Sequence, residues 1–128
     1  MKKKNVTLTP AEWNVMECLW EESPQTLMQL VSALRERVGW AKSTTTTMLS
    51  RMEKKGMVTC GETEKPRRYT PAVRREDAVE QETHSFINRV FQGSVGMMMN
   101  TLVEQQDLTP EEIHQLYAIL QKAEGGKK

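Results

Sequence analysis

The chain has few of the residues from which small enzymes and extracellular proteins build their sites. Two cysteines, Cys18 and Cys60, offer no disulfide framework and no multi-cysteine metal cluster, which suits a reducing cytoplasm. The two histidines, His84 and His114, lie far apart in the sequence, and we interpret each as a surface residue. The chain contains no Gly-rich phosphate loop, HExxH motif or nucleophile elbow. We therefore expect neither an enzyme nor a bound metal or cofactor.

Long apolar segments are also lacking. No apolar run approaches the roughly 18 residues that a membrane helix needs. The basic N-terminus, MKKKNVTLTPAEW, has no apolar core behind it and is not expected to be a signal peptide. We therefore predict a cytoplasmic protein without stable membrane association. Phe and Tyr number two each against nine Met, which favours a core or an association surface made of flexible side chains.

Charge is distributed unevenly along a chain whose net charge is only +1. Residues 35–75 contain eleven Lys and Arg against four Glu, a net charge of +7, whereas residues 76–124 contain two Lys and Arg against nine Asp and Glu, a net charge of −7. A basic middle followed by an acidic end predicts two functions, with the polyanion-binding one in the middle. Simple solvated faces are the alternative.

Three helix patterns occupy the first half of the chain. Thr9-Pro10-Ala11-Glu12 and Thr26-Leu27-Met28-Gln29 each combine a capping threonine with a Glu or Gln three residues later, as in a capping box. The second helix is expected to stop near Gly39, and a third to end at Gly56.

Two short strands are expected after the third helix. Residues 57–60 and 67–70 read as strands, joined by a turn over residues 61–66. Three helices followed by a small hairpin have the order of a winged helix. The sequence thus predicts a mainly α protein with a winged helix-turn-helix domain over residues 1–72.

Four consecutive threonines, Thr44 to Thr47, lie within the third helix although threonine is β-branched and a mediocre helix former. Helical spacing places only Thr45 on the buried stripe with Leu49 and Met52, so the other hydroxyls face outward. Such short side chains let a helix approach DNA closely, where hydroxyls contact phosphates or bases and the methyl packs against thymine. The neighbouring basic residues, and two arginines on the hairpin, favour the same partner. These are Arg51, Lys54, Lys55, Arg67 and Arg68.

Residues 73–128 are predicted to form a helical dimerisation arm. One helix is expected from Glu76 to about Gln92, a second after a capping Ser94, and a third after Thr109. Apolar faces without an internal partner usually pack on another chain. Packing back on the N-terminal domain is the alternative. The positions expected at the dimer interface are Phe86, Val90, Met98, Met99, Leu102, Ile113, Leu116 and Leu120.

Five segments together resemble one family of regulators. They are LTPAEWNVMECLW at 8–20, WAKSTTTTMLSRMEKKG at 40–56, YTP at 69–71, FINRVFQGSV at 86–95 and TPEEIHQL at 109–116. In these segments the chain resembles the BlaI/MecI/CopY repressors, also called the penicillinase repressor family. The resemblance covers nearly the whole chain.

The resemblance implies a cytoplasmic transcriptional repressor. Such proteins are homodimers of an N-terminal winged helix and a C-terminal helical arm, and they bind dyad-symmetric operator DNA with the third helix in the major groove. The family's recognition-helix contacts fall here on Ser43, Thr44, Thr46, Thr47 and Arg51. With the flanking and hairpin cations, the predicted DNA-binding set is Lys42, Ser43, Thr44, Thr46, Thr47, Arg51, Lys54, Lys55, Arg67 and Arg68.

Two parts of the third helix depart from the family. Members often have Pro and then Lys where this chain has Lys42 and Ser43, and a basic residue is frequent at the position of Thr46. Lys or Arg to guanine is the commonest specific contact with a base. We therefore hypothesise an operator that is read more through thymine methyl groups.

Relief of repression has two precedents in the family. The copper-responsive branch has a C-terminal CxC…CxC motif, and the lack of cysteine after Cys60 argues against copper sensing of that type. The β-lactam-responsive branch is cleaved in the arm by a membrane sensor protease, typically at Asn-Phe. The matching stretch here places the bond at Asn100-Thr101 or at Thr101-Leu102. A plain dimer-interface segment is the alternative.

A second function fits the same fold. A winged-helix module could use its third helix and hairpin to bind protein without sequence-specific DNA binding. The affinity of a DNA complex falls steeply with salt, by a log–log slope of roughly −0.9 per neutralised phosphate. An apolar protein interface is much less sensitive, so salt distinguishes the two.

Overall fold

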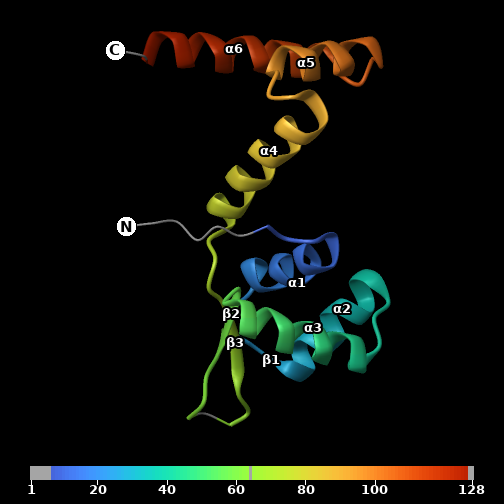
Figure 1. Ribbon diagram of the computed structural model, residues 1–128, viewed down its shortest axis with the longest axis vertical. Coiled ribbons are helices and arrows are strands. Elements are labelled where there is room, and N and C mark those ends of the chain that lie inside the picture. The colour runs from blue at the N-terminus through green and yellow to red at the C-terminus, as the bar shows by residue number, and fades with distance from the viewer. Residues whose placement is uncertain (1–6, 64, 127–128) are drawn as a thin grey trace. The chain divides into compact units, whose positions relative to one another are not determined.

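The computed structural model describes residues 7–63 and 65–126 and is mainly helical (Figure 1). Its helices and strands follow the predicted winged helix-turn-helix order, and three further helices complete the chain. In order they are α1 (Pro10–Glu21), β1 (Gln25–Thr26), α2 (Leu27–Val38), α3 (Lys42–Lys55), β2 (Val58–Cys60), β3 (Arg68–Pro71), α4 (Arg75–Phe91), α5 (Val95–Glu104) and α6 (Pro110–Gly126). The predicted fold class is therefore confirmed. The basic segment at residues 1–6 lies outside the described residues.

The chain forms two compact units, which divide between Thr83 and His84. The first unit reaches past residue 72, where the sequence predicts a domain boundary, and the core of this unit includes Val73 and Ala78. The division of function between residues 1–72 and 73–128 stays a prediction.

The predicted capping boxes are present at the starts of α1 and α2. The Thr9 hydroxyl accepts from the Glu12 backbone N–H at 3.1 Å, and a Glu12 carboxylate oxygen accepts from the Thr9 N–H at 2.9 Å. Thr26 and Gln29 make the same reciprocal pair at 3.2 and 2.8 Å. Each box satisfies backbone donors that a helix start leaves unpaired, which explains why both helices begin where the sequence predicts.

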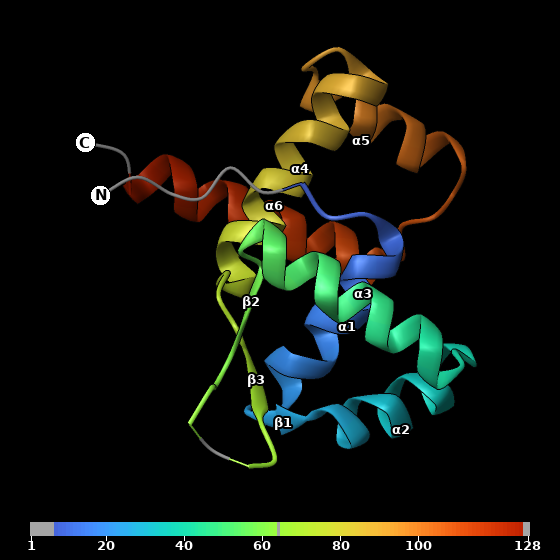
Figure 2. The same cartoon turned by 60° about the horizontal axis from the view of Figure 1, so that its bottom comes forward.

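The wing is a three-stranded antiparallel sheet in the order β1-β3-β2 (Figure 2). The predicted hairpin pairs Val58 with Pro71 and Cys60 with Tyr69. Strand β1, which the sequence analysis missed, pairs Gln25 with Tyr69 on the other edge of β3. This third strand joins the turn end of β3 to the start of α2.

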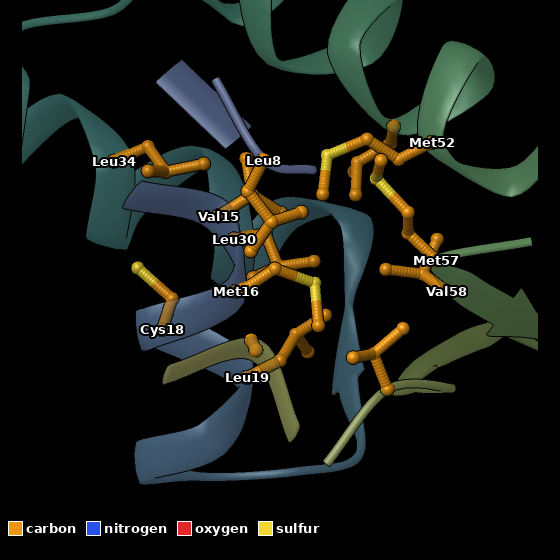
Figure 3. Packing of buried hydrophobic residues seen from close by; sticks show 13 residues of the cluster. Leu8, Val15, Met16, Cys18, Leu19, Leu30, Leu34, Met52, Met57 and Val58 are labelled. Atoms are coloured by element: carbon orange, nitrogen blue, oxygen red, sulfur yellow. The ribbon is translucent and has the colours of Figure 1, made fainter. Parts of the chain in front are cut away.

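A single core holds the first unit together, as Figure 3 shows in close-up. The Thr45 side chain is fully buried, as predicted from its spacing with Leu49 and Met52. Cys18 is buried in the same core and behaves as a small apolar residue, since burial raises the pKa of its thiol despite the nearby Arg37 charge. The buried members are Leu8, Val15, Met16, Cys18, Leu19, Leu30, Leu34, Leu49, Met52, Met57, Val58, Val73 and Ala78.

The second unit consists of the later turns of α4 with α5 and α6. Between α4 and α5, Gln92 and Gly93 both adopt positive φ angles, 53° and 86°, and Ser94 then caps α5 through the Met97 N–H at 3.0 Å. None of the α5 residues, all of which are described, is buried. The unit leaves many large apolar side chains exposed: Phe86, Val90, Val95, Met97, Val103, Ile113, Tyr117, Ile119 and Leu120.

Candidate nucleic-acid interface

The outer face of α3 is built from short hydroxyl side chains. Ser43, Thr44, Thr46 and Thr47 are all exposed, whereas Thr45 points into the core with Leu49 and Met52. The helix therefore combines a firmly packed inner stripe with an outer face that protrudes little. Such a face can enter a groove until its backbone lies close to the bases.

The start of α3 differs from the starts of α1 and α2. Its N-cap is Ala41, which has no side chain to accept a hydrogen bond, and no acidic residue lies in the first turn. The N–H groups of Thr44 and Thr45 both point to the Ala41 carbonyl, at 3.1 and 3.2 Å. A helix start without a side-chain cap presents its first N–H groups and the positive end of its dipole to an anion such as a DNA phosphate.

Thr46 has its hydroxyl turned back to the helix. The Thr46 hydroxyl donates to the Lys42 carbonyl oxygen at 2.9 Å, one turn earlier. Since the hydroxyl proton is used inside the helix, the Thr46 methyl group is the part best placed for an outside contact. This geometry agrees with the hypothesis of an operator read through thymine methyl groups.

The cations of α3 fall into two groups. In the part of the chain that the structure describes, no acidic side chain pairs with Lys42, Arg51 or Lys54 within 4.0 Å. Lys55, by contrast, donates to a Glu12 carboxylate oxygen at 2.9 Å. The first three charges are thus free for phosphate, whereas the Lys55 charge is engaged within the protein.

Glu12 is the most deeply buried carboxylate among the described residues, with a relative exposure of 3%. Burial alone would raise its pKa, but hydrogen bonds from Lys55 and from the Thr9 N–H, together with the Lys55 charge, lower the pKa below the ordinary 4.5. The pair joins the end of α3 to the start of α1. Lys55 therefore has a structural partner that no local sequence pattern predicts, because 43 residues separate the two in the chain.

The two hairpin arginines are both exposed and lie where the turn of the wing enters β3. Arg67 donates through Nε to the Gly61 carbonyl at 3.1 Å, and its guanidinium lies 3.9 Å from the Glu53 carboxylate. Arg68 is a member of β3 and pairs with Thr26 of β1. Figures 1 and 2 both show the hairpin projecting away from the helices of its unit. The wing thus offers positive charge where its turn enters β3. Residue 64 of the turn lies outside the described residues.

The residues predicted at the dimer interface lie on the three helices of the arm. Phe86, Val90, Ile113 and Leu120 are exposed by 40, 48, 41 and 63%. The remaining four are partly buried: Met98, Met99, Leu102 and Leu116.

The two predicted cleavage bonds lie within α5. Asn100 and Thr101 are exposed and Leu102 is partly buried, all in helical conformation. The Thr101 hydroxyl donates to the Met97 carbonyl at 3.0 Å. Proteolysis at either bond therefore requires local unfolding of α5.

Other kinds of site find no support in the described residues. Over residues 7–63 and 65–126, no three His, Cys, Asp or Glu side chains come together as a metal site. None of the described helices combines the length and the apolar character that crossing a membrane requires.

Comparisons with known proteins point to one family. A family model described as penicillinase repressor matches residues 8–122. The penicillinase repressor of Bacillus licheniformis is 32% identical over 126 residues, covering 98% of each chain. The methicillin resistance regulatory protein MecI of Staphylococcus aureus (strain N315) is 28% identical over 122 residues, covering 95% of this chain and 99% of that protein.

A solved structure extends the likeness to three dimensions. The monomeric form of Bacillus licheniformis BlaI, in complex with the blaP half-operator, superposes with a TM-score of 0.53 at 29% identity. The match covers 59% of this chain and 93% of that one.

Proposed function

The chain belongs to the penicillinase repressor family, and we propose that it represses transcription by binding a dyad-symmetric operator as a homodimer. The observation that supports this most is the outer face of α3, where exposed hydroxyls accompany three cations without an acidic partner in the described chain. Membership of a repressor family also confirms the prediction that the chain is not an enzyme.

In the proposed complex, α3 lies in the major groove. The uncapped N–H groups at its start and the Lys42 ammonium bind a phosphate on one side, and Lys54 binds the backbone near its other end. Arg51 and the exposed threonines face the bases or the flanking phosphates. Phosphate contacts fix the position of the helix, and the base contacts supply sequence preference.

Dimerisation is proposed through the second unit. Its exposed apolar side chains are too many for a surface that faces only water, and a two-fold dimer buries the same face on both chains. Two winged helices related by such an axis bind two half-sites related by the same axis.

Relief of repression is proposed to occur in the cytoplasm by cleavage of the arm, at Asn100-Thr101 or Thr101-Leu102, by a membrane sensor protease. Cutting within α5 would separate the winged helix from part of the apolar surface and so weaken dimers. Mass spectrometry of the chain after induction tests this proposal; a chain that stays intact while repression is lost would contradict it.

Fluorescence anisotropy tests the DNA-binding proposal. The purified protein is titrated on the duplex just upstream of its own gene and on a shuffled duplex, each over a range of salt. We expect tight binding to the upstream duplex alone, with a log–log salt slope of roughly −0.9 per phosphate contact. Arg51→Ala should weaken binding, while Lys122→Ala, which removes the same charge from α6, should not.

The alternative of a protein-interaction module predicts a different result. Equal, weak binding to both duplexes would leave only a basic surface, and the DNA-binding proposal would fail.

A further inference from the structure

The connection from β3 into α4 is fixed in place within the first unit. The Ala72 N–H donates to the Met57 carbonyl oxygen at 2.8 Å, next to the start of β2. Val73 is 5% exposed and Ala78, in the first turn of α4, is 3% exposed, and both belong to the core. The chain therefore enters α4 without a free hinge between β3 and this first turn.

Trp20, near the end of α1, holds the same connection from the other side. Its indole Nε1–H donates to the Val73 carbonyl oxygen at 2.9 Å. The Trp20 ring packs edge-on against Trp13, with centroids 5.5 Å apart and planes at 70°. Because two aromatic residues of α1 fix each other, the indole donor is held at a defined position.

Arg75 joins the first turn of α4 to the same tryptophan. Its guanidinium carbon lies 5.9 Å from the centroid of the Trp20 ring, and its NH2 lies 3.4 Å from a Glu17 carboxylate oxygen. A cation over a tryptophan face, with a carboxylate alongside, is held in both direction and distance. The neighbouring Arg74 has its ion pair with Glu76, two residues later in the sequence, and in the described chain no acidic side chain of α1 pairs with it.

We propose that Glu17, Trp20 and Arg75 form a clamp that sets the direction in which α4 leaves the winged helix, and thereby the half-site spacing that the dimer accepts. This inference rests on the proposed function. No Gly or Pro interrupts α4 from Arg75 to Phe91, so the helix preserves the direction given by its first turn. Because α4 begins in one unit and ends in the other, the clamp acts on the element that links recognition to dimerisation.

A spacing series tests the clamp. Footprinting on the duplex upstream of the gene first locates the two half-sites. Full-length protein is then titrated on this duplex and on versions with one or two base pairs added or removed between the half-sites. Each base pair rotates one half-site by roughly 35° and moves it by about 3.4 Å. Arg75→Gln removes the cation at the surface, Trp20→Phe removes the indole donor, and Arg74→Gln is the matched control. A single half-site duplex measures binding by the winged helix alone.

The wild type and Arg74→Gln should lose tenfold or more affinity for each altered spacing. Arg75→Gln and Trp20→Phe should bind all spacings within about threefold of one another, with half-site affinity unchanged within about twofold. An Arg75→Gln protein that keeps the wild-type spacing preference would overturn the clamp. This outcome decides the question even if Trp20→Phe does not fold. A wild-type protein that binds no upstream duplex would instead refute the proposed function.

Discussion

Thr45 brings a hydroxyl group into the packed interior of the first unit. The side chain is fully buried, and its Oγ1 has no hydrogen-bond partner among the residues that the structure describes. Thr45→Val keeps the shape and removes the unsatisfied group. We expect the free energy of unfolding to rise by about 1 kcal/mol, measured by urea denaturation.

Thr45→Ser provides the matched comparison for this site. It keeps the hydroxyl and deletes the methyl, and it should lower stability by about 1 kcal/mol. A Thr45→Val protein less stable than the wild type would show that the hydroxyl has a partner after all.

Lys54 and Lys55 are adjacent lysines for which we predict opposite effects. Lys55→Ala removes the partner of the buried Glu12 carboxylate, so stability should fall by about 1–2 kcal/mol, a figure moderated by the half-exposed Lys55 side chain. Lys54→Ala should leave stability unchanged and weaken operator binding. Urea denaturation and anisotropy on both proteins check the pair; equal stability losses would contradict the assignment.

Glu12 makes the free energy of unfolding depend on pH. The pKa of its carboxyl is lower in the folded protein than its ordinary 4.5, so the unfolded chain binds the proton more readily. The contribution is therefore complete above about pH 4.5 and is lost as the pH falls through the folded pKa. Glu12→Gln should flatten this acid limb of the stability curve. Thermal melts across that range provide the measurement, and an unchanged acid limb would mean that other carboxylates dominate it.

Some contacts of these residues can be predicted from the sequence and others cannot. The burial of Thr45 follows from helical spacing, and the capping role of Glu12 follows from a pattern of four residues, Thr9 to Glu12. The bond between Glu12 and Lys55 does not, because it depends on how α1 and α3 pack after the chain folds. Patterns of a few residues therefore predict contacts within an element, whereas contacts between elements can be identified only once the fold is known.

Helix α3 allows a test of how the operator is read. The Thr46 hydroxyl donates its proton within the helix, and the side chain as a whole is exposed. Thr46→Arg replaces the threonine methyl with a bidentate donor suited to guanine, and should add roughly 1–3 kcal/mol of preference for guanine at one position per half-site. Selection from a randomised operator measures the preference. Gln115→Arg adds the same charge on α6 and should leave the base preference unchanged. An unchanged preference in Thr46→Arg would show that position 46 does not face a base.

The elements themselves were largely predictable, with one exception that has a clear cause. Helix ends at Thr9, Gly39, Gly56 and Ser94 follow from caps that act over a few residues. Strand β1 is two residues long and exists only because β3 lies beside it, so no periodicity could reveal it. The N-cap of α3 was also missed as a feature, although an alanine before a helix start was visible at position 41.

We predict that the exposed apolar face of the second unit holds the dimer together. Leu120 is 63% exposed, and Leu120→Glu would place a charge at the proposed interface. We expect this protein to sediment as a monomer at micromolar concentration and to lose at least tenfold affinity for a full operator, with half-site binding unchanged. Gln121→Glu adds the same charge at the next residue and should stay dimeric. A dimeric Leu120→Glu protein would place the interface elsewhere.

The exposed apolar face also has a consequence for dosage. If the operator binds only dimers, its occupancy depends on the concentration of dimers rather than on the total concentration of the protein. Where single chains predominate, halving their number lowers the concentration of pairs about fourfold. Partial degradation of the protein, or its dilution during rapid growth, would therefore derepress the regulated genes more steeply than the same loss of a monomeric repressor.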